Sequence, residues 1–410
     1  MYASGSIGYN HPKIVESQHI LGRVSKSKPT LSDLYNSDYA DFMKTFDEIA
    51  IPDYLKHTFF IEGGSLAVEN ALKIAFDWKV RKNLESGNSK QGSKIIHFKQ
   101  AFHGRSGYTL SLTNTSDPRK TMYFPKFNWP RIDNPYLKFP ITDESIRETV
   151  EKENIAIAQI KEAIKENPGE IAAIIIEPIQ GEGGDNHFRC AFFQKLKDLS
   201  LENEFLLIYD EVQTGIGITG KMWAHQHFSQ NSCKNFAQKL CQCESTVENS
   251  PVPDIISFGK KSQVCGVLAG PRIDEVENNS FVESSRINST FGGSLTDMMR
   301  FKIILEVIRD EKLVDNARDS GNYLLKKLID LSNEFPGFVT NPRGLGLFAA
   351  FDLPSGTERD HVWNEMMKNN LLILPSGDQS IRFRPHLNVT TNDLDTAIDL
   401  VSKSLKKSLR

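Results

Sequence analysis

With 410 residues, the chain is long enough to bury a large core, and its length suggests two or three domains or one large domain with a smaller companion. Its net charge of -3 gives no reason to expect nucleic acid or an anionic membrane surface as a partner. No apolar run is long enough to span a bilayer, and the N-terminus has neither the basic start nor the apolar core of a signal peptide.

The first part of the chain predicts alternating helices and strands. A turn of sequence EGGS precedes residues 66–83, whose apolar side chains recur at helical spacing. Short apolar runs bounded by loop residues then predict strands at 94–98, 171–179, 205–212 and 254–258. This alternation is typical of βα units that build a mainly parallel sheet.

The last part of the chain has a different pattern. Residues from 295 predict a long helix, and the remainder predicts strands and turns between two helices. We therefore expect an α/β fold with a large domain over 41–294 and a smaller α+β domain over 295–410. Residues 1–40 are expected to return to the small domain.

Five cysteines are few for this length, and their odd number predicts reduced thiols in a cytoplasmic compartment. Cys233, Cys241 and Cys243 cluster downstream of His225 and His227. Their spacing matches no established zinc pattern, so we interpret 230–253 as a polar surface insertion and expect no metal.

Polar groups follow the predicted strands where each strand ends. Asp210 closes one apolar run, and Glu177 and Glu182 follow another together with a Gly-Gly turn. The last run leads into Lys260 and Lys261. Ligands of open α/β sheets gather at the carboxyl ends of the strands, so we expect the chemistry at this edge.

The two adjacent lysines need an explanation, because a buried ammonium is costly unless it is paired or neutralised. Neighbouring residues of a strand point to opposite faces. At most one of Lys260 and Lys261 should therefore enter a site, and the alternation does not say which.

Two further stretches supply complementary groups. Gly64 and Ser65 offer amides and a hydroxyl at a helix N-terminus, which suits a phosphate. Phe102 can stack on a flat ring, and Arg105 can hold a carboxylate by two parallel hydrogen bonds. Together with a carboxylate and a lysine, these are the groups that pyridoxal phosphate requires: the lysine forms a Schiff base with the aldehyde, and the carboxylate keeps the pyridine nitrogen protonated.

Each signal has a plainer interpretation when taken alone. The EGGS turn would be an ordinary helix cap, and Asp210 would be half of a structural ion pair. Phe102 would be a core aromatic, and Thr290 would be a turn residue. The charged side chains would lie on the surface: Arg105, Glu182 and Arg382. The conjunction of all these groups at element ends favours the cofactor site.

The motifs resemble those of the class III (subgroup II) aminotransferases, pyridoxal-phosphate enzymes of fold type I, over nearly the whole chain. The resemblance rests on the strings EGGSLAVENALKIAFDWK, AFHGRSGYTLSLTNT, EPIQGEGGDNHFR, DEVQTGIGITG, FGKKSQVCGVLAG and NSTFGGSLTDMMR. Within the family these strings are most similar to those of the lysine 6-aminotransferases. The 4-aminobutyrate enzymes share several of them but typically differ after FHGR and after the double lysine. The segment that precedes GYNHP in the family is expected to be missing here.

The resemblance implies how the cofactor would be held. Gly64 and Ser65 would bind its phosphate, and Thr290 would reach the phosphate of the other subunit's cofactor across a homodimer interface. Lys260 corresponds to the Schiff-base lysine, which leaves Lys261 as a supporting or outward-facing cation. The ring would be contacted by Phe102, which stacks on it, by Asp210 at its nitrogen, by Val212 beneath it and by Gln213 near its phenolic oxygen, with His103 as a further cofactor-binding residue.

The resemblance also implies the substrates, L-lysine and 2-oxoglutarate/L-glutamate. Arg105 would grip the carboxylate of the amino donor, Arg382 would take the α-carboxylate of glutamate, and Asn288 would be a further substrate-binding residue. Glu182 would pair with Arg382 while lysine is bound and release it for glutamate. The expected reaction is a ping-pong transfer of the ε-amino group of L-lysine to 2-oxoglutarate, giving 2-aminoadipate 6-semialdehyde and L-glutamate.

Three alternatives stay open at this point. The chain could be another ω-aminotransferase, acting on 4-aminobutyrate or ornithine. An isomerase or aminomutase of the same fold would not need the paired arginines. A catalytically impaired relative that serves as a dimerisation partner would not need the complete set of cofactor-binding groups.

Overall fold

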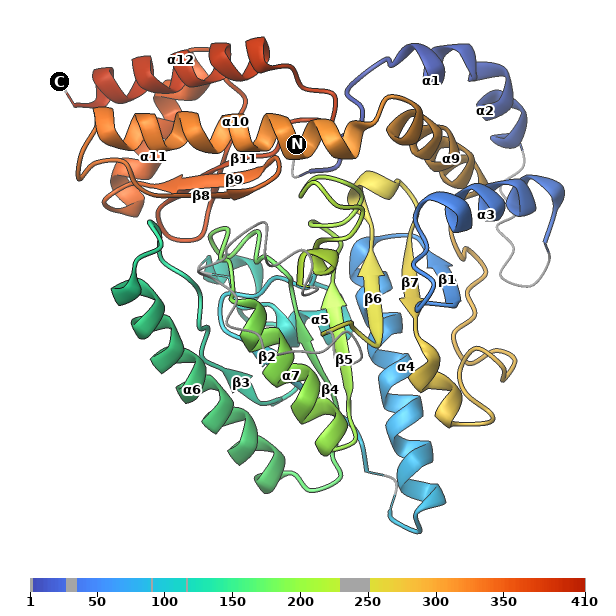
Figure 1. Cartoon of the computed structure of the whole chain (residues 1–410). Coiled ribbons are helices and arrows are strands. Elements are labelled where there is room, and N and C mark those ends of the chain that lie inside the picture. The colour runs from blue at the N-terminus through green and yellow to red at the C-terminus, as the bar shows by residue number, and fades with distance from the viewer. Residues whose placement is uncertain (1–2, 27–34, 90, 116, 229–250, 410) are drawn as a thin grey trace.

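The computed structural model describes residues 3–26, 35–89, 91–115, 117–228 and 251–409. These residues form two separate sheets (Figure 1). The larger sheet has seven strands in the order β1-β7-β6-β5-β4-β2-β3. Its strands are β1 (His57–Ile61), β2 (Lys94–Phe98), β3 (Arg131–Ile132), β4 (Ile171–Ile176), β5 (Leu206–Asp210), β6 (Ile255–Phe258) and β7 (Cys265–Ala269).

The large sheet is mainly parallel. Strands β3, β2, β4, β5 and β6 run in one direction. Strand β7 runs in the opposite direction, and β1, which is antiparallel to β7, runs in the same direction as the parallel strands. The runs predicted at 94–98, 171–179, 205–212 and 254–258 all contain strands of this sheet, so those predictions are confirmed. The carboxyl ends of β4, β5 and β6 consequently lie at one edge, where the polar groups predicted from the sequence follow them.

Helices cover both faces of the large sheet, which explains why its strands are apolar throughout. Every residue of β4 is buried, as is usual for a parallel strand enclosed on both sides. Along β5, Leu206 and Ile208 join the core beneath α4 (Gly64–Glu85). Leu207 and Tyr209 face the opposite core, which includes residues of α7 (Cys190–Glu202). Among the described residues, this part also contains the α-helices α5 (Gly107–Leu112) and α6 (Asp143–Glu166).

The smaller sheet is antiparallel, with strand order β10-β11-β9-β8. Its strands are β8 (Thr340–Leu345), β9 (Phe348–Asp352), β10 (Leu374–Ser376) and β11 (Ser380–Phe383). Helices α10 (Leu313–Glu334), α11 (Gly356–Lys368) and α12 (Thr391–Ser408) lie with it at one end of the molecule (Figure 1). The strands and helices predicted after residue 295 are therefore present.

The N-terminal helices pack against α9 (Leu295–Asp310) rather than against the small sheet. They are α1 (Pro12–Glu16), α2 (Gln18–Val24) and α3 (Ser37–Ile49), and all of them contact α9. Phe42 and Phe46 of α3 meet Phe301 of α9 in an aromatic cluster. The domain division stays our proposal; its boundary between residues 40 and 41 lies inside α3.

No helix in the described ranges is long and apolar enough to cross a membrane. The same ranges contain no group of three or more His, Cys, Asp or Glu side chains that could hold a metal ion. Cys233, Cys241, Cys243 and most of the predicted insertion at 230–253 lie outside the described residues.

Candidate active site

Lys260 and Lys261 lie in a tight turn between β6 and β7. The chain leaves β6 through Gly259 and forms a short 3-10 turn, Lys260–Ser262. Lys260 has a φ of 56°, a left-handed conformation that is uncommon for a residue with a side chain and that is enriched at functional sites. Because the residues form a turn and not a strand, the strand alternation assumed from the sequence does not apply to them.

The two side chains enter different environments. Lys260 lines a cavity, whereas Lys261 does not. Lys261 is only 1% exposed, and its Nζ donates to the carbonyl oxygens of Gln213 at 2.7 Å and Ala3 at 3.4 Å. The expectation that Lys261 could face outward is therefore wrong, because the turn buries Lys261.

The cavity lies at the carboxyl edge of the large sheet and has a volume of about 230 Å³. All residues predicted to bind the cofactor line it, except Thr290. The full lining is Gly64, Ser65, Phe102, His103, Gly104, Glu177, Asp210, Val212, Gln213 and Lys260. Residues from the ends of β4, β5 and β6 and from the start of α4 thus converge on one space.

A network of hydrogen bonds fixes Asp210 at this cavity. Its Oδ2 lies 2.8 Å from Nδ1 of His103, and its Oδ1 accepts from the hydroxyl of Ser257 at 3.1 Å and the amide of Val212 at 3.0 Å. A carboxylate only accepts hydrogen bonds, so Nδ1 of His103 carries the proton in this contact. Asp210 is consequently held as an oriented anion, which suits a protonated ring nitrogen.

The environment of Lys260 favours the neutral form of its amine. Burial lowers the pKa of its ammonium group, although the charges of Asp210 and Glu177 act in the opposite direction. A lysine attacks an aldehyde only in its neutral form, so a lowered pKa favours attachment of an aldehyde cofactor.

Glu177 also lines the cavity, although the sequence analysis assigned it no role. Its Oε1 accepts from the amide of Phe102 at 2.9 Å, and its Oε2 accepts from the amide of Gly181 at 3.0 Å. Burial raises the pKa of Glu177 to about 7, and the charge of Asp210 adds to this effect. Its position at the end of a predicted strand was the one signal for it in the sequence.

The N-terminus of α4 forms an open anion cradle. The residue before the helix is Gly63, with a φ of 96°, and no side chain caps the first amides. The hydroxyl of Ser65 bonds those of Ser106 at 2.5 Å and Thr109 at 2.8 Å. A Cβ at Gly104 would lie 2.3 Å from Oγ of Ser65, so only glycine fits there. The uncapped amides and hydroxyls are suited to a phosphate.

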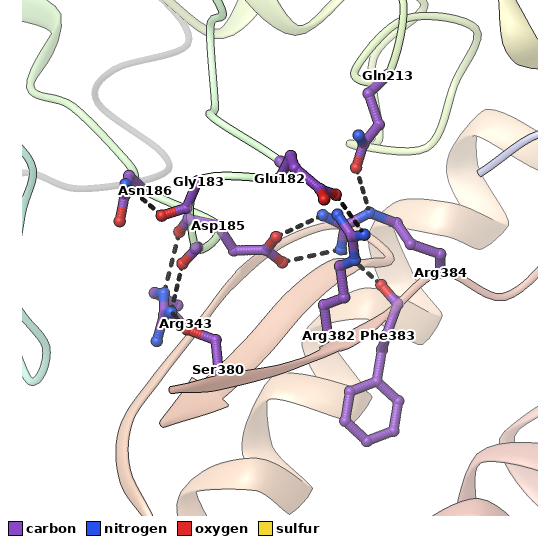
Figure 2. Close-up of polar contacts among 12 residues, drawn as sticks. Glu182, Gly183, Asp185, Asn186, Gln213, Arg343, Ser380, Arg382, Phe383 and Arg384 are labelled. Carbon is purple, nitrogen blue, oxygen red and sulfur yellow. Dashed lines mark hydrogen bonds and ion pairs between the residues drawn. The ribbon is translucent and has the colours of Figure 1, made fainter. Parts of the chain in front are cut away.

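Two arginines at the end of β11 contact loop residues that follow β4 and β5 (Figure 2). Arg382 of β11 is 2% exposed, and its Nη2 donates to Oε2 of Glu182 at 2.8 Å. The other oxygen of Glu182 accepts from Nζ of Lys120 at 2.5 Å. Burial alone would raise the pKa of Glu182, but the charges of Arg382 and Lys120 outweigh it and hold the pKa below its usual value. Lys120 was not predicted from the sequence.

Arg384 is the second arginine, and it was also missed from the sequence. It donates to both carboxylate oxygens of Asp185, at 2.6 and 2.9 Å, and its Nε donates to Oε1 of Gln213 at 3.1 Å. Its spacing of two from Arg382 on an extended segment was a usable signal, because such residues share a face.

Five of the predicted residues do not line the cavity: Glu182 and Arg382, which pair with each other, and three others. Arg105, Asn288 and Thr290 are exposed, and none of them lines it. Asn288 instead borders a separate cavity of about 210 Å³, next to Tyr35 and Phe59. The role predicted for Thr290 requires a second subunit and stays a prediction.

The comparisons with known proteins agree with this site. The profile of the Aminotransferase class-III family matches residues 1–235 and 239–405. An L-lysine-epsilon aminotransferase of Mycobacterium bovis is 46% identical over 407 residues, which cover 98% of this chain and 85% of the relative. A probable mitochondrial 4-aminobutyrate aminotransferase of Caenorhabditis elegans is 34% identical over 420 residues, covering 98% and 81%.

A solved structure is similar over its whole fold. It is a lysine aminotransferase from Mycobacterium tuberculosis in the internal aldimine form, with a TM-score of 0.91 and 44% identity, covering 99% of this chain and 88% of that one. The chain therefore belongs to the class III aminotransferases. It is a pyridoxal-phosphate-dependent transaminase of fold type I, so the predicted fold class, enzyme class and cofactor are confirmed.

Proposed function

We propose that this protein transfers the ε-amino group of L-lysine to 2-oxoglutarate, yielding 2-aminoadipate 6-semialdehyde and L-glutamate in a ping-pong reaction. The observation that carries the proposal is the ion pair between Glu182 and Arg382, which lies beside the turn that contains Lys260. The 46% identity to an L-lysine-epsilon aminotransferase supports lysine as the amino donor. A semialdehyde that keeps its α-amino group should then cyclise spontaneously.

The cavity residues fit pyridoxal phosphate, because an amine, a fixed carboxylate and an anion cradle line one small space. We assign Lys260 to the cofactor aldehyde, Asp210 to the ring nitrogen and the start of α4 to the phosphate. Phe102 and Val212 would enclose the ring. When bound, the cofactor supplies an electron sink for the carbon that loses a proton.

Lys260 has a second role in this proposal. With cofactor and amine donor bound, the side chain of Lys260 would act as a general acid and base that takes a proton from one carbon atom and returns it to another. Its lowered pKa suits this role, because burial makes the neutral, proton-accepting form of the amine easier to reach.

The Glu182–Arg382 pair answers a problem of dual specificity. The site must accept lysine with its distal amine at the cofactor, and later 2-oxoglutarate with its α-carbon there. An unpaired guanidinium beside the apolar stem of lysine would be costly, and a removable partner avoids that cost. Glu182 neutralises Arg382 in the lysine half-reaction and, once it moves away, leaves Arg382 to bind the α-carboxylate of glutamate.

Further contacts complete the proposal. Arg105 would hold the α-carboxylate of lysine, and Asn288 would contact substrate. Thr290 would bind the cofactor phosphate of a second copy, so we propose a homodimer in which each subunit completes the other's site.

Product analysis tests the proposal. The purified protein is loaded with cofactor and given L-lysine and 2-oxoglutarate, and glutamate and the cyclised semialdehyde are quantified; L-ornithine and 4-aminobutyrate replace lysine in parallel. We expect equal amounts of both products with L-lysine and at least about 10-fold lower kcat/KM for the other donors, a difference of about 1.4 kcal/mol. A preference for ornithine or 4-aminobutyrate would overturn the substrate assignment, and turnover without a keto acid would indicate an isomerase or aminomutase.

A further inference from the structure

The carboxamide of Gln213 is held in a defined place between the two domains. Gln213 lines the cavity and lies three residues after Asp210, the last residue of β5. Its carboxamide lies against Gly181, where a Cβ would come within 2.4 Å of Oε1 and 2.5 Å of Nε2. A side chain at position 181 would therefore displace it. Packing decides where this group lies, but packing alone does not distinguish its oxygen from its nitrogen.

The contact with Arg384 distinguishes the oxygen of the Gln213 carboxamide from its nitrogen. A guanidinium donates hydrogen bonds and accepts none, so the atom of Gln213 that meets Nε of Arg384 at 3.1 Å must be the oxygen. Burial lowers the pKa of Arg384 to about 10, while Asp185 acts to raise it, so Arg384 stays protonated at neutral pH. The NH₂ of Gln213 is then left as a donor, and no acceptor in the described part of the chain takes its protons.

Arg384 itself is held rigidly. Its two Nη atoms bind both oxygens of Asp185, and its guanidinium carbon lies 3.2 Å from the centre of the Phe348 ring (Figure 2 shows the Asp185 contact). The side chains of Arg384 and Asp185 are 1% and 0% exposed. A bidentate, stacked guanidinium of this kind has one well-defined orientation.

We propose that Arg384 is a positioning residue that fixes the carboxamide of Gln213 with its NH₂ toward the cavity, as a donor to the phenolic oxygen of the bound cofactor. The inference rests on the proposed cofactor-binding role of Gln213. Arg382 and Arg384, both at the end of β11, would then have different roles. Arg382 changes its partner between the two substrates. Arg384 stays fixed and keeps the contact between Gln213 and the phenolic oxygen unchanged in both half-reactions.

A pH titration of the visible absorbance of the cofactor-loaded protein tests this proposal. A hydrogen-bond donor to the phenolic oxygen stabilises that oxygen as an anion. It therefore lowers the pKa of the proton shared between this oxygen and the nitrogen that joins Lys260 to the cofactor. Arg384→Lys keeps the charge and a pairing with Asp185 but loses the fixed Nε donor. We expect Arg384→Lys to raise the midpoint of this pH titration by roughly 0.4 to 1 pH unit, which is the range for loss of one hydrogen bond.

Two comparisons separate this role from a structural one. In a Gln213→Ala background, Arg384→Lys should add no further shift, because the contact is already lost. Arg343→Lys is the matched control: Arg343 donates to the carbonyls of Gly184 and Asp185 in the same loop but does not contact Gln213. It should leave the midpoint unchanged.

The outcomes are distinguishable. An equal shift in both backgrounds, or no shift from Arg384→Lys, would overturn the positioning role. If Arg384→Lys does not give folded protein, Asp185→Asn, which loosens the pair that holds Arg384, carries the test with the same expected direction. Absence of any visible absorbance in the unmodified, loaded protein would instead refute the proposed cofactor site.

Discussion

Lys260 and Lys261 are adjacent in the chain, yet the side chain of Lys260 lines the cavity while that of Lys261 donates to the carbonyl oxygens of Gln213 and Ala3. The hydroxyl of Ser6 in turn donates to the carbonyl of Lys261 at 2.6 Å. The turn therefore assigns the two lysines different tasks. Lys260 lines the cavity, and Lys261 connects the turn to the N-terminal segment and to the loop that contains Gln213.

Substitution of each lysine tests this division. Lys260→Ala should abolish the visible absorbance of the bound cofactor and lower kcat by at least about 10²- to 10⁴-fold, the range for loss of a general acid and base. Lys261→Ala should retain the absorbance, because it removes only contacts to backbone. Spectra of both proteins after incubation with excess cofactor provide the measurement. Absorbance that survives in the first variant and is lost in the second would reverse the assignment.

Glu182 should affect the two half-reactions unequally. Glu182→Gln removes the charge that neutralises Arg382, so the guanidinium would face the apolar stem of lysine. We expect kcat/KM for L-lysine to fall by about 10- to 100-fold and that for L-glutamate to change much less. Single half-reactions followed by stopped-flow absorbance give both values. Equal losses of kcat/KM for the two substrates would contradict the role of the pair. The variant Lys120→Met, measured in the same way, shows how much the other cationic partner of Glu182 contributes.

Arg105 is exposed, so its proposed grip on the lysine carboxylate needs a direct test. Arg105→Met should raise KM for L-lysine by about 10-fold or more, as expected for loss of a charge-assisted contact. It should have little effect on 1,5-diaminopentane, which offers the same distal amine without a carboxylate. Comparable losses for both amines would show that Arg105 acts on something other than that carboxylate.

Glu177 should make the stability of the cofactor-free protein depend on pH. Its pKa is about 7 in the folded protein against an ordinary 4.5, so the folded state binds the proton more tightly than the unfolded state. The stabilisation is complete below about pH 4.5 and is lost as the pH rises to about 7, by roughly 3 kcal/mol at most.

Urea unfolding between pH 5 and pH 7.5 measures this effect. Glu177→Gln cannot ionise, so its free energy of unfolding should fall less over that interval than that of the unsubstituted protein. Parallel pH profiles for the two proteins would show that Glu177 is already ionised in the fold.

Local patterns were enough to predict much of the site. Asp210 ends one apolar run and the Lys260–Lys261 pair follows another, and parallel strands carry their ligands at the carboxyl ends. The choice of Lys260 over Lys261 came from the resemblance to the family. The start of α4 was predicted from its glycines and helical spacing. The small domain was also predicted as strands between helices, because its alternation is regular.

The remaining features depend on contacts between residues that are distant in the chain. Arg384 meets Gln213 across 171 positions, and Lys120 meets Glu182 across 62 positions, so no local pattern announces either contact. The burial of Lys261 was missed because a 3-10 turn replaced the assumed strand. Asn288 and Thr290 lie outside the cavity, and their proposed tasks depend on a second copy of the chain.

The absorbance of the cofactor-loaded protein during a single pair of half-reactions tests the proposed function most directly. The visible absorbance should disappear when L-lysine is added without a keto acid, and it should return when 2-oxoglutarate follows, with one glutamate formed for each subunit. Retention of the absorbance in L-lysine, together with its loss in 4-aminobutyrate or L-ornithine, would contradict the account.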